Sequence, residues 1–174
     1  MSSPVFERLP GLRRATLAPC VSRLHVGDTG RRYRGEVDVE HGRGILAALC
    51  RWVMRLPPAG RGAIEIRIDD EGEAERWTRR FGQRTMTSVL WVGNGLLHER
   101  IGAVTLQFVI RVEDGALAWR AVGARCLGVP LPGRAFAQVG AREHEESGRY
   151  HFDVHATLPI VGFLLRYRGW LDVE

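Results

Sequence analysis

Two dipeptides, Asn94-Gly95 and Asp114-Gly115, constrain the fold of this chain more than any other feature. Both readily adopt the positive φ angles that two-residue hairpin turns require. The residues around them alternate in polarity, and residues 104–112 place four apolar side chains on one face. This period of two is the pattern of a half-buried strand. The sequence therefore predicts consecutive antiparallel hairpins.

A different period appears at residues 44–56. Ile45, Leu49, Trp52 and Val53 recur at helical spacing and form one apolar stripe, and the pair Pro57-Pro58 ends it. This stripe has to be buried, and the concave side of a curled sheet is a natural place for it. The prediction is an α+β fold: a strongly curved, mostly antiparallel β-sheet or partial barrel of seven to nine strands that grips one amphipathic helix at about residues 44–56.

The domain organisation follows from where the pattern begins. Residues 1–30 are weakly patterned and are predicted to be a weakly structured N-terminal segment, in which a short helix would be broken at Pro19. Residues 31–174 are predicted to form a single curved-sheet domain.

Location is inferred from what the chain lacks. No apolar run approaches the ~20 residues that span a bilayer, so no membrane span is expected. The N-terminus carries charges and prolines where a signal peptide needs an apolar core, and a cytoplasmic location is therefore predicted. The three cysteines, Cys20, Cys50 and Cys126, are odd in number and far apart, as free thiols in a reducing compartment would be.

The basic character of the chain does not indicate nucleic-acid binding. The formal net charge is +5, but all 25 basic residues are arginine and are spread among 20 acidic ones. Proteins that bind nucleic acids usually gather their positive charge on one face or arm. No nucleic-acid partner is predicted.

The sharpest cluster of chemical groups is His151, Asp153 and His155. On a strand these alternate residues share one face, and they are weak candidates for a metal site. The other face of the strand is apolar, so the cluster is expected to face solvent, and no cofactor is predicted. An enzyme, either a hydrolase or an isomerase, remains an alternative, with these residues or Glu99 in the mouth of a barrel.

Aromatic and arginine residues are spread over several predicted strands. If a few of them face the inside of the sheet, they would line an apolar pocket with a cationic end. The candidates for ligand binding are Trp77, Trp91, Trp119, Arg120, Arg166, Tyr167 and Trp170. The alternative is that the tryptophans fill the core and the arginines lie over its rim.

Several segments together resemble a known family. These are Gly44 to Gly60, Glu75 to Gly82, Leu97 to Gly102, Leu127 to Gly133 and Gly148 to Leu171. They are similar to a bacterial family known as domain of unknown function 4166. Such domains occur alone or fused to domains that resemble saccharopine dehydrogenases or epimerases, so the resemblance implies a possible partner oxidoreductase. It implies no catalytic residues.

The function expected from these observations is non-catalytic binding of a small hydrophobic or amphipathic ligand, in a domain that could be accessory to an oxidoreductase. The alternatives are the enzyme described above and a protein–protein interaction module with an exposed apolar patch. The sequence leaves the oligomeric state and the identity of the ligand open.

Overall fold

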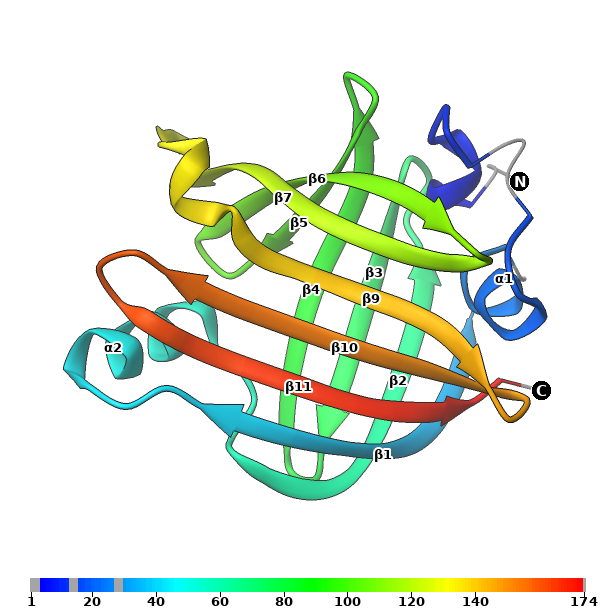
Figure 1. Ribbon diagram of the computed structural model, residues 1–174, viewed down its shortest axis with the longest axis horizontal. Coiled ribbons are helices and arrows are strands. Elements are labelled where there is room, and N and C mark those ends of the chain that lie inside the picture. The colour runs from blue at the N-terminus through cyan, green and yellow to red at the C-terminus, as the bar shows by residue number, and fades with distance from the viewer. Residues whose placement is uncertain (1–3, 13–15, 27–29, 174) are drawn as a thin grey trace.

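The strands of this chain close into a barrel in the computed structural model, which describes residues 4–12, 16–26 and 30–173 (Figure 1). Within these residues there are eleven antiparallel strands. They are β1 (Arg31–His41), β2 (Gly60–Asp70), β3 (Ala74–Phe81), β4 (Arg84–Gly93), β5 (Leu96–Ile101), β6 (Val104–Glu113), β7 (Ala116–Cys126), β8 (Val129–Leu131), β9 (Gln138–Glu146), β10 (Arg149–Leu158) and β11 (Gly162–Asp172).

Closure comes from the two partners of β7. The neighbours follow the order β6-β5-β4-β3-β2-β1-β11-β10-β9-β7, and β6 also pairs with β7, so ten strands form a complete circle. The short β8 adds to β7 outside the circle. In Figure 1, β9, β10 and β11 run across the front while β2, β3 and β4 cross behind them. The strong twist of long sheets produces such crossing walls, and side chains from both walls meet inside.

The hairpins predicted from sequence are confirmed. Asn94 and Gly95 have φ angles of 52° and 75° and join β4 to β5. Asp114 and Gly115, at 51° and 79°, join β6 to β7. Positive φ at both central residues is the conformation whose twist matches that of the flanking strands.

The predicted number of strands was too low. The two missing strands are β5, which has six residues between tight turns, and β8, which has three residues including Pro130. The turn from β5 to β6 is Gly102-Ala103, which lacks the Asn-Gly or Asp-Gly signal. The curved or barrel-like antiparallel sheet itself is confirmed, and the barrel is fully closed.

One end of the barrel is closed by the start of the chain. A 3₁₀ helix, η1 (Val5–Arg8), and an α-helix, α1 (Pro19–Val26), bury Phe6, Val21 and Leu24 there. The helix begins at Pro19 and is not broken there, because proline lacks only an N–H that a first helical residue does not use. The first and the last segments that the structure describes both lie at this end (Figure 1). How the chain divides into domains stays a prediction.

The sheet does not grip the amphipathic helix, and that part of the prediction was wrong. Helix α2 (Ile45–Met54) lies at the rim of the opposite end, and of its residues only Ala47 is buried. It joins the end of β1 to the start of the neighbouring β2 through short connections, residues 42–44 and 55–59, which hold it at the rim. A second 3₁₀ helix, η2 (Gly133–Phe136), lies between β8 and β9.

Among the helices of the described residues, none has the length and apolar character needed to cross a membrane. The cytoplasmic location stays a prediction.

Candidate functional site

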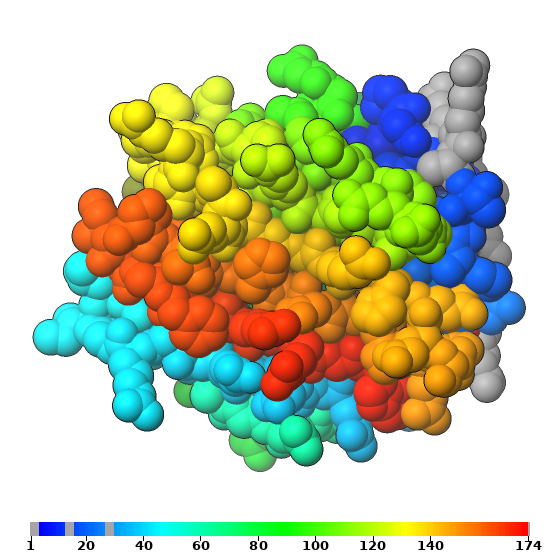
Figure 2. Space-filling model, viewed as in Figure 1, coloured from blue at the N-terminus to red at the C-terminus, as the bar shows by residue number. Residues whose placement is uncertain are grey.

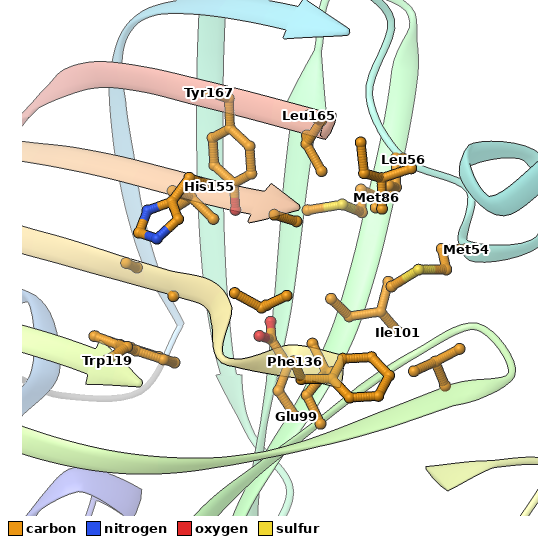
Figure 3. Close-up of a pocket in the computed structure, with 18 of the residues that line it drawn as sticks. Met54, Leu56, Met86, Glu99, Ile101, Trp119, Phe136, His155, Leu165 and Tyr167 are labelled. Carbon is orange, nitrogen blue, oxygen red and sulfur yellow. The ribbon is translucent and has the colours of Figure 1, made fainter. Parts of the chain in front are cut away.

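A cavity of about 350 Å³ lies inside the barrel, between α2 at the open end and η1 at the closed end. Most of its lining is apolar. Near the mouth the lining comes from Met54, Met86, Ile101, Phe136 and Leu165, which Figure 3 shows pointing into it from α2, η2 and three strands. The strands supply these side chains because every second residue points inward. The cavity is therefore a feature of the closed barrel and not of a single loop.

The floor of the cavity is an aromatic layer around Phe6. Its ring centroid lies 3.8 Å from that of His25, 5.4 Å from Trp119 and 6.3 Å from Trp77. Trp77 and Trp119 also line the cavity above this layer. Glu75 fastens the segment to the barrel, since it accepts hydrogen bonds from the Val5 N–H at 3.1 Å and Trp77 Nε1 at 2.9 Å. The N-terminal segment is thus the base of the cavity.

A buried ion pair stands in the wall of the cavity. Arg79 on β3 donates to Glu99 Oε1 on β5 at 3.2 Å and to Ser88 Oγ on β4 at 2.7 Å. Both charged side chains are buried and both line the cavity. In Figure 3 the carboxylate of Glu99 and the hydroxyl of Tyr167 point toward one another across the interior. The polar groups of the cavity therefore lie deep within it, beyond the apolar mouth.

A second buried pair lies next to the floor. His25 Nε2 and Glu143 Oε2 are 2.5 Å apart, and Glu143 also lines the cavity. Tyr150, another lining residue, has its ring 6.4 Å from that of His25. Among the described residues, no hydrogen-bond partner is present for His25 Nδ1 or for the indole Nε1 of Trp119. Buried polar atoms without partners are rare in proteins, and these two lie near the base of the cavity.

The interior shifts the pKa values of two tyrosines and of Arg79. Burial raises the pKa of Tyr167 to about 12, and burial followed by the charge of Glu143 raises the pKa of Tyr150 well above its ordinary value. Burial acts to lower the pKa of Arg79, but the charge of Glu99 and of other neighbours outweighs it, so the pKa is raised. At neutral pH both tyrosines are uncharged and the arginine is charged.

Three of the seven residues that the sequence indicated for ligand binding line the cavity: Trp77, Trp119 and Tyr167. Their inward position follows from the register of β3, β7 and β11. Whether any of them binds a ligand stays a prediction.

The other four do not line the cavity. Trp91 stacks on His98 at 5.2 Å, and Trp170 lies under the guanidinium of Arg149 at 4.2 Å. Each is next along its strand to an inward residue, Leu90 and Leu171, so it faces outward. Arg120 is exposed beside the inward Trp119, and Arg166 pairs with Asp153. The expected cationic end of the pocket is absent from the described lining, where the arginine present is neutralised by Glu99.

His151, Asp153 and His155 do not form a site together, because they have different surroundings. Asp153 accepts hydrogen bonds from Arg166. These bonds hold the pKa of Asp153 below its ordinary value, although burial acts in the opposite direction. His151 lies 3.8 Å from Glu146, while His155 is exposed and contributes to the edge of the cavity. No group of three metal-ligating side chains occurs in the described part of the chain. Of the four residues of the enzyme alternative, Glu99 and His155 line the cavity and His151 and Asp153 do not, so the four do not converge on one cleft.

The cysteines are free thiols, as the sequence indicated. Burial, followed by Glu145, raises the pKa of Cys20, whose thiol donates to the Gly148 carbonyl at 3.1 Å. Cys50 and Cys126 line the cavity.

Sequence reasoning missed Arg79, Glu143 and Phe6. A signal was present for the first two, because each charge falls on the inward register of its strand. Arg79 stands between the inward Trp77 and Phe81. A charge on the apolar face of a strand requires a buried partner.

Comparison with known proteins gives one match. A family model described as Domain of unknown function (DUF4166) matches residues 17–171. No curated protein matches the chain.

Proposed function

The chain belongs to the family of domain of unknown function 4166, and we propose that it binds a small hydrophobic or amphipathic ligand inside its barrel without chemical conversion. The observation that carries the proposal is the cavity of about 350 Å³, which opens beside α2 and ends on the Phe6 layer. Its volume is within the range of about 300–1,000 Å³ that is usual for ligand sites. The mostly apolar lining favours a mostly apolar ligand.

The polar groups of the cavity favour a ligand whose polar end is uncharged. The charge of Arg79 is balanced by Glu99 in direct contact, so a ligand carboxylate would compete with Glu99 for the same guanidinium. A hydroxyl or carbonyl group instead finds donors and acceptors in Tyr167 and Glu99 without a desolvation penalty for a second charge. A long-chain alcohol, a sterol-like molecule and a quinone share this chemistry.

The proposal of an accessory role beside an oxidoreductase rests on the family resemblance alone. The enzyme alternative is less favoured, because only His155 and Glu99 of its four residues line the cavity, while His151 lies beside Glu146 and Asp153 pairs with Arg166 outside it. Acid–base catalysis needs such groups within hydrogen-bond reach of one substrate.

Native mass spectrometry of the freshly purified chain, compared with its denatured mass, tests the proposal. We expect additional mass under native conditions that disappears on denaturation, and the released compound identifies the ligand class. For a ligand lost in purification, binding of the fluorescent fatty alcohol analogue dansyl-undecanol serves as the probe.

A matched pair of variants locates the binding. Ala156 lines the cavity on β10, and Ala156→Phe fills part of its volume. Ala118 on β7 is outside the lining, so Ala118→Phe adds the same bulk to the outer face. We expect the first variant to lose at least tenfold in probe affinity and the second to bind as the wild type does. Equal affinity in both variants, or no binding by the wild type, contradicts the proposal.

A further inference from the structure

Large apolar side chains are exposed around the open end of the barrel. On α2, Ile45 is 88% exposed and Trp52 is 77% exposed. In the turn from β7 to β8, Leu127 is 82% exposed, and in the turn from β10 to β11, Ile160 is 87% exposed. Exposure of large apolar side chains to water is unfavourable. Several such side chains at one place mark a surface that contacts another molecule or a membrane.

These segments are neighbours around the mouth. Gly42, just before α2, donates its N–H to the Leu164 carbonyl at 3.0 Å, beside the turn that carries Ile160. At the other end of α2, a Cβ placed on Gly102 would lie 2.9 Å from the Val53 carbonyl. The adjacent Ala103 carbonyl accepts from the Leu127 N–H at 2.9 Å. The exposed apolar residues therefore form one ring, which we call the mouth face.

The charge around this face has one sign. The segments that build it, residues 41–64, 79–88, 100–106, 122–139 and 156–165, contain no aspartate or glutamate. The mouth face itself is therefore free of carboxylates; Glu40, which immediately precedes the first of these segments, is exposed and pairs with Arg168.

Five exposed arginines surround the face: Arg43, Arg55, Arg84, Arg125 and Arg134. Within the part of the chain that the structure describes, none of these five forms an ion pair. Some exposed arginines elsewhere are paired, as Arg76 is with Glu71 and Arg168 with Glu40, while others on the barrel wall, such as Arg111 and Arg120, form no ion pair within the described residues. The mouth face thus combines apolar side chains with uncompensated positive charge.

The acidic residues gather at the other end. The turns and strand ends there carry Asp70, Glu71, Glu73, Asp114 and Glu146. Arginines such as Arg76 and Arg149 pair with acidic residues at that end, and the cavity mouth, whose segments have no carboxylates, is therefore the more positive end. Such a charge distribution orients a protein toward a negative surface.

An open groove of about 680 Å³ lies between α2 and the turn from β3 to β4. Arg51, Arg55 and Arg84 line it together with Trp52 and His41, and its lining includes no carboxylate. Guanidinium groups bind phosphate oxygens in a bidentate manner. The groove has the chemistry of a site for anionic head groups, immediately beside the exposed apolar side of α2.

We infer that the mouth face docks onto the surface of an anionic phospholipid bilayer. The apolar side chains of α2 and of the two turns enter the boundary between head groups and acyl chains, while the arginines contact lipid phosphates. In Figure 2 the segment coloured cyan, which includes α2, projects from the body of the molecule. Projecting apolar side chains flanked by positive charge suit a soft, negative surface better than a rigid protein pocket. The inference goes beyond ligand binding and does not depend on it.

Co-sedimentation of the full chain with vesicles tests the inference. One set of vesicles contains phosphatidylcholine alone, and the other contains equal parts of phosphatidylcholine and phosphatidylserine. We expect binding to the second set, weak or no binding to the first, and a shift of tryptophan emission to shorter wavelength that Trp52→Phe reduces. Salt should weaken binding, because it screens the arginine–phosphate attraction.

Two pairs of variants separate the contributions of charge and apolar contact. Arg55→Asn together with Arg84→Gln removes two charges from the groove, and asparagine tolerates the left-handed conformation (φ 53°) of residue 55. Each arginine near an anionic surface contributes about fivefold to membrane affinity, so the double variant should bind about 25-fold more weakly. Its control, Arg111→Gln with Arg120→Gln, removes two exposed charges from the barrel wall and should bind within about twofold of the wild type.

The apolar contribution is tested by Ile45→Gln with Trp52→Gln, which should lose at least about tenfold in vesicle affinity. Its control is Val26→Gln, a change at an exposed apolar residue of α1 at the closed end of the barrel. Absence of binding to phosphatidylserine vesicles overturns the inference, and so does binding that none of the mouth-face variants weakens. Concentration-dependent dimerisation of a chain that does not bind vesicles would assign the face to a second copy.

Discussion

Replacement of Glu99 by glutamine removes one charge of the buried pair in the cavity wall and leaves nearly the same volume. Arg79 is then a buried cation without a carboxylate partner, which keeps its hydrogen bond to Ser88 Oγ at 2.7 Å and its position 5.1 Å from the centroid of the Trp77 ring. The amide introduced by Glu99→Gln can still accept a hydrogen bond, but it carries no charge to compensate the guanidinium. The variant therefore isolates the electrostatic part of the interaction.

The expected loss follows from the burial of both partners. Breaking a buried pair by removing one charge costs about 3–5 kcal/mol, because the other charge stays out of water without compensation. The Ser88 contact and the cavity beside Arg79 favour the lower value, about 3 kcal/mol in the free energy of unfolding. With a denaturant slope of about 2 kcal/mol/M, the urea midpoint should fall by about 1.5 M.

Urea unfolding followed by far-UV circular dichroism measures this loss. The control is Glu65→Gln, which breaks the exposed pair of Glu65 with Arg34 and should change the midpoint little, since solvent screens that pair. A second variant, Arg79→Met with Glu99→Leu, removes both charges and should recover most of the stability.

Two results would refute this reasoning. One is a midpoint for Glu99→Gln that stays close to that of the surface control. The other is a double variant as unstable as Glu99→Gln, because the loss would then come from packing and not from an uncompensated charge.

Three further predictions concern the floor of the cavity and its titrating groups. Phe6→Ala should lower the free energy of unfolding by about 3–5 kcal/mol in the same urea assay, because it empties the layer against Trp119; a loss below about 1 kcal/mol would contradict a packed floor. Since the pKa of Tyr167 is raised to about 12 in the folded chain, its contribution to stability is complete below the ordinary tyrosine pKa and is lost as pH rises from there toward 12. Tyr167→Phe should reduce this alkaline loss, and an unchanged profile would argue against it. Since the hydrogen bond from Arg166 holds the pKa of Asp153 below its ordinary value, Asp153 contributes stability that is lost as pH falls through the folded pKa; Asp153→Asn should flatten this acid limb in urea unfolding at several pH values, and an unchanged limb would assign it to other carboxylates.

The hairpins could be predicted from sequence because their determinants are local. Asn94-Gly95 and Asp114-Gly115 set the backbone angles of their own turns, and alternation sets the faces of the strands beside them. The strand β5 was missed because it has only six residues, LLHERI, and they include a charge at an inward position. Closure depends on the pairing of β1 with β11 and of β7 with β9, which no local pattern specifies.

The candidate site was less predictable than the fold, because its polar members come together only after closure. Arg79, Ser88 and Glu99 stand on three successive strands and meet through the register of β3, β4 and β5. Alternation assigns a side to each residue of a strand but does not show which side is inside. The size of a side chain does not show this either, because the large Trp91 and Trp170 face outward while the adjacent Leu90 and Leu171 are buried. A charged residue at an inward position is the better signal, since it requires a partner.

Helix α2 shows why the sequence alone left the binding surface open. Its apolar stripe predicts contact with an apolar surface but does not identify that surface. The concave side of the sheet is only one of the surfaces that could cover it. In this barrel Phe6, Val21 and Leu24 occupy the far end, and the inward side chains of ten strands fill the walls. The short connections to β1 and β2 then keep the helix at the rim, with Trp52 in water. A stripe that the fold leaves unburied, beside arginines without carboxylate partners, is the arrangement expected when the missing apolar partner lies outside the chain. A bilayer surface supplies both the apolar boundary and the negative charge.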